Sequence, residues 1–273
     1  MLHTAVALTR SSHPGPSIAV TIVTVVLAIG AQLEPWRVAV LGLAMLLNQL
    51  SVGWSNDWLD AARDRSVGRD DKPVALGLVS VAAVRRAAVM AAVASIALTV
   101  PLGWPAVVAH AIALASAWSY NVWLKNTALS VAPFVLSFGL LPAIVTLASA
   151  EPVVAPWWAL GAGALLGVAA HVANVLPDLE ADRATGIHGL PHRLGPRVSG
   201  AVIAVSLAAA SGLLLVGDVD PVHITGFAAA LCLAVASLIL VLTRPPTRLL
   251  FRLIIAAALL DVVLLALSGA GLR

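Results

Sequence analysis

The sequence predicts an all-α protein that crosses a membrane about nine times. Of its 273 residues, 60% are hydrophobic and 11% are charged, and the mean hydropathy is +0.99. A soluble domain is about 45–50% apolar and about 25% charged. The composition therefore excludes a soluble enzyme, a disordered chain and a disulfide scaffold, and it indicates an integral membrane protein.

Nine apolar stretches are candidates for membrane helices, since a helix needs about 20 mostly apolar residues to cross the hydrocarbon core of a bilayer. In chain order they are 17–33, 36–54, 87–102, 104–122, 128–150, 157–176, 198–216, 224–242 and 249–267. Gly103 separates the third stretch from the fourth, and it stands between Pro101 and Pro105, which are turn residues. We expect residues 1–273 to form one transmembrane domain.

The basic residues predict the orientation of this domain. If the N-terminus lies inside, 14 of the 16 Lys and Arg residues fall on the inner side, and only Arg37 and Arg273 fall outside. Because cytoplasmic loops are enriched in Lys and Arg, we expect a protein of the cell membrane with its N-terminus in the cytoplasm and its C-terminus outside. The net charge of +3 does not point to a nucleic-acid partner, since no basic run is interleaved with aromatic residues.

Most of the acidic residues gather in two of the inner regions. Eight of the 13 are found there, and they are Asp57, Asp60, Asp64, Asp70 and Asp71 after the second stretch and Asp178, Glu180 and Asp182 after the sixth. Orientation in the membrane requires no acids at these places. We therefore expect a functional site at the inner face.

The two acidic regions, 56–77 and 174–195, are copies of one pattern. Eight positions are identical at a constant offset of 118 residues, namely Asn56/Asn174, Asp60/Asp178, Asp64/Asp182, Arg65/Arg183, Gly68/Gly186, Pro73/Pro191, Leu76/Leu194 and Gly77/Gly195. Four apolar stretches separate the copies, so both reach the same side of the membrane. The pattern predicts a parallel internal repeat.

Helix geometry indicates which acids face the same way. No Pro or Gly interrupts 54–67, so the second membrane helix can continue through the first motif. There the side chains of its amide and three acids span an arc of about 100°, and they are Asn56, Asp57, Asp60 and Asp64. In a helical second motif, Asp178 and Asp182 lie about 40° apart and Glu180 points about 160° away from either. We therefore do not expect Glu180 to be a primary ligand.

Clustered carboxylates raise one another's pKa unless a cation joins them. Carboxylate and amide oxygens suit a hard cation, and Mg²⁺ commonly binds through one or two carboxylates together with phosphate oxygens of a substrate. Two facing acidic motifs therefore predict a Mg²⁺ site that holds a diphosphate. Nearby bases are candidates for neutralising the phosphate charge, although each alone is equally an ordinary base of an inner loop; they are Arg65, Arg69, Lys72, Lys125, Arg183 and Arg193.

The pattern Asn-Asp-x-x-Asp-x-x-x-Asp after the second stretch and Asp-x-x-x-Asp after the sixth, in a chain of nine spans, resembles the UbiA superfamily of intramembrane prenyltransferases. The resemblance covers essentially the whole chain. It implies a UbiA-like helical bundle that binds an isoprenoid diphosphate through Mg²⁺ and ionises it to an allylic cation. The prenyl chain then passes to a hydrophobic acceptor in the bilayer, most commonly an aromatic precursor of a quinone.

The resemblance also implies roles for individual residues. Asp60, Asp64, Asp178 and Asp182 would be the catalytic residues and would hold Mg²⁺ together with Asn56. Substrate would be bound by Asn56, Asp57, Arg65, Lys72, Tyr120, Lys125, Asn174, Arg183 and Arg193. The family often has Tyr-x-x-x-Lys after its fourth span, and here the spacing from Tyr120 to Lys125 is one residue longer.

Other side chains have two interpretations each. The aromatic residues near the motifs are candidates for stabilising a cation through their ring faces or for packing and interface anchoring, and they are Trp54, Trp58, Trp118, Trp123, Phe134 and Phe138. His171 is either an acceptor contact or a buried hydrogen-bonded histidine. We expect Asp261, Asn48 and His110 to make contacts between helices, and we place His188 and His192 in a loop, where they do not form a metal pair.

Three alternatives differ in what they require. A UbiA-type terpene cyclase would ionise the same diphosphate without an acceptor and would favour a closed pocket with more aromatic residues than the 5% present here. A transporter would place its polar site near the middle of the bilayer. A membrane scaffold without catalytic activity has no reason to carry the acidic pattern twice.

Overall fold

The computed structural model describes residues 2–70, 72–179, 182, 186–217, 219–243 and 248–272, and this part of the chain is helical without strands. The α-helices are α1 (Leu2–Arg10), α2 (Pro14–Gly30), α3 (Pro35–Ser66), α4 (Val81–Thr99), α5 (Trp104–Val122), α6 (Ala132–Leu147), α7 (Trp157–Val175), α9 (Leu190–Gly217), α10 (Pro221–Thr243) and α11 (Arg248–Leu267). Short 3₁₀ turns are η1 (Val100–Leu102), η2 (Leu124–Asn126), η3 (Leu176–Asp178) and η4 (Ser268–Leu272). The predicted fold class is confirmed.

Local sequence explains where the helices begin. Proline occupies the first turn of α2, α3, α5 and α6, where a missing N–H costs nothing because the first N–H groups have no partner within the helix. Ser80 caps α4 by accepting a hydrogen bond from the Ala83 N–H at 3.2 Å. Asp220 caps α10 in the same way, accepting from the His223 N–H at 2.8 Å, and this hydrogen bond lowers the pKa of Asp220.

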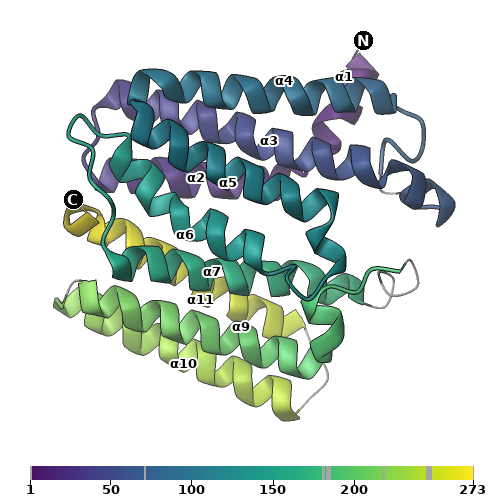
Figure 1. The fold of residues 1–273 in the computed structure, drawn as a ribbon. Helices are drawn as coiled ribbons and strands as arrows, with labels where there is room; N and C mark the ends of the chain where they lie inside the picture. Colours follow the sequence, from purple (N-terminus) through teal and green to yellow (C-terminus); the bar gives the residue numbers. More distant parts are fainter. Residues whose placement is uncertain are drawn as a thin grey trace.

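The long helices form one bundle whose last helix returns to the first. Consecutive helices pack against each other from α2 to α7 and from α9 to α11, α7 packs against α9, and α11 contacts α2. The two chain ends lie at opposite ends of the bundle (Figure 1), as an odd number of crossings requires. The C-terminal ends of α3, α5 and α7 lie at the end of the bundle that carries α1 (Figure 1).

The surface of the bundle suits a bilayer. Five helices of the described chain, α3, α4 with η1, α7, α9 and α10, are long and apolar enough to cross a membrane, and α2, α6 and the described part of α11 are shorter apolar helices. Large apolar side chains such as Met90 and Val93 are 70% and 65% exposed. Trp36, Trp104 and Trp157 begin α3, α5 and α7 and are exposed, which is typical of an interface belt. The composition and the fold therefore agree on a membrane protein.

Within the described residues, each of the nine predicted spans overlaps one helix. The second span continues as α3 through the first acidic motif without a break, as its uninterrupted sequence predicts. The third and fourth spans are separated at Gly103, whose φ of 110° only glycine adopts easily. The exact number of membrane crossings and the orientation stay predictions.

The positions of the helices follow the 118-residue repeat. Shifting α2 by 118 residues gives 132–148, which matches α6, and shifting α4 gives 199–217, which ends with α9 at Gly217. Shifting α5 gives 222–240, which lies inside α10. The repeated glycines also share a positive φ. Gly68 and Gly186 have φ values of 68° and 82°, and Gly77 and Gly195 have φ values of 72° and 75°. These matches are what a gapless duplication predicts, and the duplication itself stays a prediction.

Buried polar side chains join helices away from the acidic end. The amide of Asn48 on α3 lies 2.8 Å from His110 Nε2 on α5, and the Thr99 hydroxyl lies 2.8 Å from His110 Nδ1. On the other side of the bundle the Ser211 hydroxyl of α9 donates a hydrogen bond to Asp261 of α11, and both residues are fully buried. Asn48, His110 and Asp261 thus make the predicted contacts between helices.

Candidate functional site

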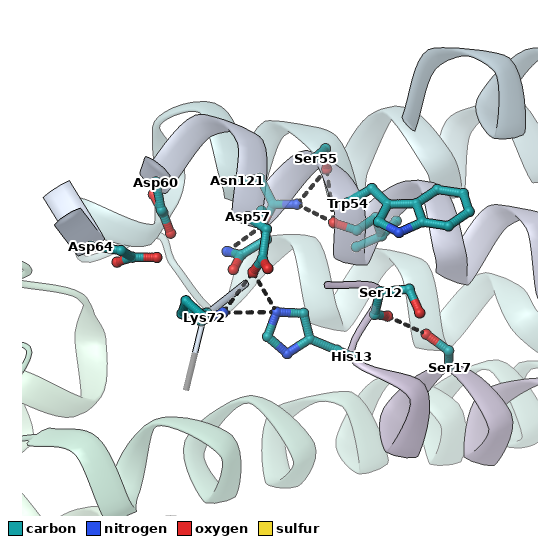
Figure 2. Close-up of polar contacts among 12 residues, drawn as sticks. Ser12, His13, Ser17, Trp54, Ser55, Asp57, Asp60, Asp64, Lys72 and Asn121 are labelled. Atoms are coloured by element: carbon teal, nitrogen blue, oxygen red, sulfur yellow. Dashed lines mark hydrogen bonds and ion pairs between the residues drawn. The ribbon is translucent and has the colours of Figure 1, made fainter. Parts of the chain in front are cut away.

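The first acidic motif occupies the C-terminal end of α3, where three of its carboxylates are buried. Asp57, Asp60 and Asp64 are 2%, 6% and 3% exposed. They are separated by three and four residues, so they lie on neighbouring positions of one helix face. Figure 2 shows Asp60 and Asp64 next to each other, and Asp57 one turn further into the bundle.

Cations already pair with the two carboxylates nearest the helix end. Arg63 Nη2 lies 2.9 Å from Asp60 Oδ2 and 3.2 Å from Asp64 Oδ1, so one positive charge serves both. The other oxygen of Asp60 accepts a hydrogen bond from the Lys125 ammonium of η2. Burial lowers the pKa of Lys125, and the neighbouring Asp60 carboxylate acts in the opposite direction.

The residues that precede Asp60 are held by separate partners. Asn56 donates to the amide oxygen of Asn121 at 3.3 Å, and Asn121 in turn donates to Val52 O at 2.9 Å. Lys72 Nζ donates to Asp57 Oδ1 at 2.7 Å. Lys72 thus contacts a carboxylate of the first motif directly, and Asn56 is held by Asn121 of α5.

The segment between α5 and α6 brings the second acidic region against the first. Lys125, which pairs with Asp60, packs its backbone oxygen on Gly189, where a Cβ atom would lie only 2.7 Å from it. The Ser130 hydroxyl accepts a hydrogen bond from the Leu190 N–H at 2.9 Å and lies 3.0 Å from His171 Nε2. The chain on both sides of the second motif therefore contacts the loop that carries Lys125.

The second motif is described in part. Asp178 ends the 3₁₀ turn η3, which contains Pro177 and follows α7 directly, and the described residues Leu179 and Asp182 are α-helical. Asp182 lies 3.3 Å from His192 Nε2. His192 belongs to the first turn of α9 rather than to a loop, which corrects the placement predicted from the sequence. The described part of the chain does not include Glu180, Arg183 or the side chain of Asp178. The prediction that Asp178 and Glu180 point in different directions therefore stays a prediction.

Tyr120 lies in a cluster of rings that joins α5, α6 and α7. Its ring meets Phe134 at a centroid distance of 5.1 Å and His171 at 5.7 Å, both edge to face. Phe134 and His171 also contact each other, with centroids 4.7 Å apart. The predicted residue Tyr120 is therefore packed between the helices that precede and follow the loop of Lys125.

Small cavities lie next to this aromatic cluster. One of about 50 Å³ is lined by α2, α6, α7 and α11 and has only apolar walls, and another of about 40 Å³ is lined by α2, α3, α5 and α6. Val20, Phe138 and Leu141 line both. Phe138 also stacks on Phe134 at 6.3 Å, so the cavities begin one turn beyond Tyr120. Gly163 and Gly167 of α7 allow this arrangement, because a Cβ atom at either would lie 2.5 Å or less from a backbone oxygen of α6.

Other predicted residues lie away from the cluster in the described structure. Arg65 is exposed and its guanidinium reaches Val74 O at 3.5 Å, and Arg193 is exposed and donates to His188 O at 3.1 Å. Asn174 is exposed at the end of α7. In the described part of the chain, no hydrogen bond or ion pair joins these three residues to the acidic cluster.

The tryptophans mostly have structural partners. The Trp54 indole N–H donates to Leu8 O at 2.8 Å, and the Trp118 indole N–H donates to the Ser51 hydroxyl at 3.1 Å. Trp58 packs edge to face against Trp118, with ring centroids 6.2 Å apart, and Trp123 is 61% exposed. Phe134 and Phe138 are thus the two aromatic candidates whose rings reach the cavities or their entrance.

Four residues of the site were not among the predicted ones. Arg63 stands three residues after Asp60, and this helical spacing is the signal that indicates their pairing. Asn121 follows Tyr120 directly, whereas Ser130 and His13 carry no signal in the sequence. His13 lies 44 positions before Asp57 and reaches it only because the chain folds back.

The donor atoms fit a hard cation. Within the described residues no group of three or more His, Cys, Asp or Glu side chains is arranged to hold a metal ion. However, Asp60 and Asp64 are close enough to share the single charge of Arg63, and carboxylate oxygens are the ligands that Mg²⁺ prefers. The arrangement offers buried acidic oxygens, flanking ammonium groups and an apolar space beyond them.

Comparisons with known proteins agree with this geometry. The model of the UbiA prenyltransferase family matches residues 17–268. No curated protein matches the sequence. Among solved structures, a UbiA homologue from Archaeoglobus fulgidus bound to GPP and Mg²⁺ is similar, with a TM-score of 0.72, 14% identity and coverage of 97% of this chain and 99% of that one.

Two further structures share the fold. The apo structure of a UbiA homologue from Aeropyrum pernix K1 has a TM-score of 0.68 and 18% identity, and covers 92% of this chain and 96% of its own. A digeranylgeranylglyceryl phosphate synthase has a TM-score of 0.72 and 13% identity, and the match covers 100% of this chain and 99% of that one. Since the family model spans nearly the whole sequence, the chain belongs to the UbiA prenyltransferase family.

Proposed function

We propose that this protein transfers a prenyl chain from an isoprenoid diphosphate to a hydrophobic acceptor within the membrane, in a reaction that requires Mg²⁺. The observation that carries the proposal is the position of Lys125. Its ammonium pairs with Asp60 of the first acidic motif, and its backbone oxygen packs against Gly189, which follows the second motif. The Archaeoglobus fulgidus homologue with GPP and Mg²⁺ supports the proposal.

Asn56, Asp60, Asp64, Asp178 and Asp182 are the residues that would hold Mg²⁺. When bound, the ion neutralises the charge that develops on the leaving diphosphate. Arg63 and Lys125 now pair with these carboxylates, so both are positioned to turn toward phosphate oxygens. Fixed cations in a site of low dielectric stabilise such a charge strongly, because they need not reorganise during the reaction.

The apolar interior would protect the prenyl part of the substrate from water. The allylic cation left by the departing diphosphate reacts quickly with water, and the cavity beyond Phe134 has only apolar walls. The rings of Tyr120, Phe134 and Phe138 offer electron-rich faces to a cation at this point. We propose that the prenyl chain lies along Phe138 and that an acceptor resembling an aromatic quinone precursor attacks near Tyr120.

A UbiA-type terpene cyclase is the second candidate. The observation that favours it is the enclosed aromatic cluster, which would suit an intramolecular reaction of the cation. The candidates differ in their need for an acceptor. If purified protein with Mg²⁺ and an isoprenoid diphosphate forms a prenylated product only when an aromatic acceptor is added, it is a transferase. A cyclic hydrocarbon or alcohol formed without acceptor would identify a cyclase, and no consumption of diphosphate under any condition would refute both.

We also propose that the site faces the cytoplasm. The acidic end of the bundle carries the loops that are rich in Lys and Arg, and positive loops remain inside. An isoprenoid diphosphate made in the cytoplasm would reach this face directly. Labelling of engineered cysteines at the α1 end and at the C-terminal end of the bundle in intact cells, with a reagent that does not cross membranes, tests the orientation.

A further inference from the structure

His13 connects α1 to α2 in a backbone conformation that histidine rarely adopts. Its φ and ψ are 52° and 63°, in the left-handed region, and the next residue is Pro14. A residue before proline strongly prefers an extended backbone. Such an outlier persists only where its surroundings hold it, and it is often found at functional sites.

Helix α3 itself holds the chain in this position. The indole N–H of Trp54 donates to Leu8 O at 2.8 Å. Gly53 lies so close to Ser12 that a Cβ atom would be 2.2 Å from the Ser12 oxygen. The Ser17 hydroxyl donates to the same oxygen at 2.9 Å. Gly53 and Trp54, which hold the chain next to His13, thus lie on α3 about one turn before Asp57.

The result is a cluster of three side chains around one carboxylate oxygen. His13 Nε2 lies 3.0 Å from Asp57 Oδ1 and 2.9 Å from Lys72 Nζ, and Lys72 Nζ lies 2.7 Å from Asp57 Oδ1. Figure 2 shows the three groups converging beside Asp60 and Asp64. His13 Nε2 accepts from Lys72 in one tautomer and donates to Asp57 in the other.

Burial makes the partner of Asp57 important. Asp57 is 2% exposed, and a buried carboxylate without a hydrogen-bond donor is strongly unfavourable. Under the proposed function, Lys72 is one of the cations that bind the diphosphate. When its ammonium turns toward a phosphate group, Asp57 loses its ion pair, but His13 remains next to the same oxygen and can donate to it.

We propose that His13 is a positioning residue for diphosphate binding, which keeps Asp57 hydrogen-bonded and so allows Lys72 to engage the phosphate groups. The proposal rests on the proposed function. Without the imidazole, Asp57 holds Lys72 more tightly and the diphosphate binds more weakly. His13 itself does not touch the substrate.

Two variants separate the imidazole from the backbone conformation. His13→Gly removes the side chain, and glycine adopts a left-handed φ without strain, so folding is retained. His13→Gln replaces the ring by an amide, and Gln32 already occupies the left-handed region in this protein with a φ of 56°. Both variants can adopt the left-handed backbone of residue 13, but only His13→Gln keeps a side-chain nitrogen that can donate to Asp57.

The test is the Kd of inorganic pyrophosphate with Mg²⁺, measured by calorimetry in detergent for wild type, His13→Gly, His13→Gln, Lys72→Ala and the double variant His13→Gly/Lys72→Ala. We expect Lys72→Ala to weaken binding about tenfold, as loss of a charged hydrogen bond does. His13→Gly should raise the Kd and the KM for the isoprenoid diphosphate about three- to tenfold, with kcat within about twofold and an unchanged melting temperature, and His13→Gln should restore most of the affinity.

The double variant decides whether His13 acts through Lys72. Its Kd should equal that of Lys72→Ala, because the two residues share one effect. The inference is overturned if the two losses multiply, or if His13→Gly binds pyrophosphate as tightly as wild type. If wild type binds no pyrophosphate with Mg²⁺ and releases none from an isoprenoid diphosphate, the proposed function fails and the inference fails with it.

Discussion

Replacing Lys125 with Met removes the buried cation that joins η2 to the first acidic motif. Lys125 is 8% exposed and Asp60 is 6% exposed. Removing one partner of a buried ion pair typically costs about 3–5 kcal/mol. Because Asp60 keeps Arg63 at 2.9 Å, we expect a smaller loss of stability, about 2 kcal/mol.

That loss of stability corresponds to a melting temperature lowered by about 4–8 °C for a chain of this length. The double variant Asp60→Asn/Lys125→Met carries no unpaired charge at this position and keeps similar volumes, so its melting temperature should return to within about 2 °C of wild type. Thermal unfolding of the purified protein in detergent measures both values.

Turnover should respond differently from stability. Each group that stabilises the leaving diphosphate contributes about a hundredfold or more to the rate. We therefore expect Lys125→Met and the double variant to lose Mg²⁺-dependent release of pyrophosphate by about this factor, although only the single variant loses stability. Wild-type turnover in Lys125→Met, or recovery of turnover together with stability in the double variant, would refute the reasoning.

The remaining predictions concern the second acidic motif, the cavities and the buried carboxylate of α11. Asp178→Asn should abolish turnover and Glu180→Gln should reduce it less than about threefold; equal losses in a pyrophosphate-release assay would contradict the proposed ligand set. Phe138→Ala, which enlarges both cavities, should shift the preferred diphosphate toward longer chains in a competition assay, whereas the lipid-facing variant Leu136→Ala should not. Ser211→Ala, which removes the donor to the buried carboxylate of α11, should lower stability by about 1–3 kcal/mol and leave kcat unchanged, as thermal unfolding and steady-state kinetics would show.

Much of the fold follows from features that are local in the sequence. The apolar stretches predict the membrane helices, and the absence of Pro and Gly between 54 and 67 predicts that α3 continues through the first motif. The constant spacing of 118 residues predicts the order and positions of the later helices. These features depend on residues near in sequence or on a repeat, so tertiary packing is not needed to predict them.

The site could be predicted only in part, because several of its contacts join distant segments. Asp60 and Lys125 are separated by 65 positions, and no spacing in the sequence indicates that they pair. His13 depends on a strained turn held by Gly53, and no periodic pattern encodes such a turn. The second motif begins with a 3₁₀ turn that contains Pro177, and this turn was not predicted from the sequence.

The binding of an unreactive thiolodiphosphate analogue of an isoprenoid diphosphate tests whether the two acidic segments form one Mg²⁺-dependent site. Calorimetry on the purified protein would compare wild type with Asp60→Asn and Asp178→Asn, each with Mg²⁺ and with EDTA. We expect wild type to bind only with Mg²⁺, and each variant to lose at least about a hundredfold in affinity, although the two substitutions lie in separate segments. Tight binding in EDTA, or an Asp178→Asn variant that binds as wild type does, would contradict a shared site.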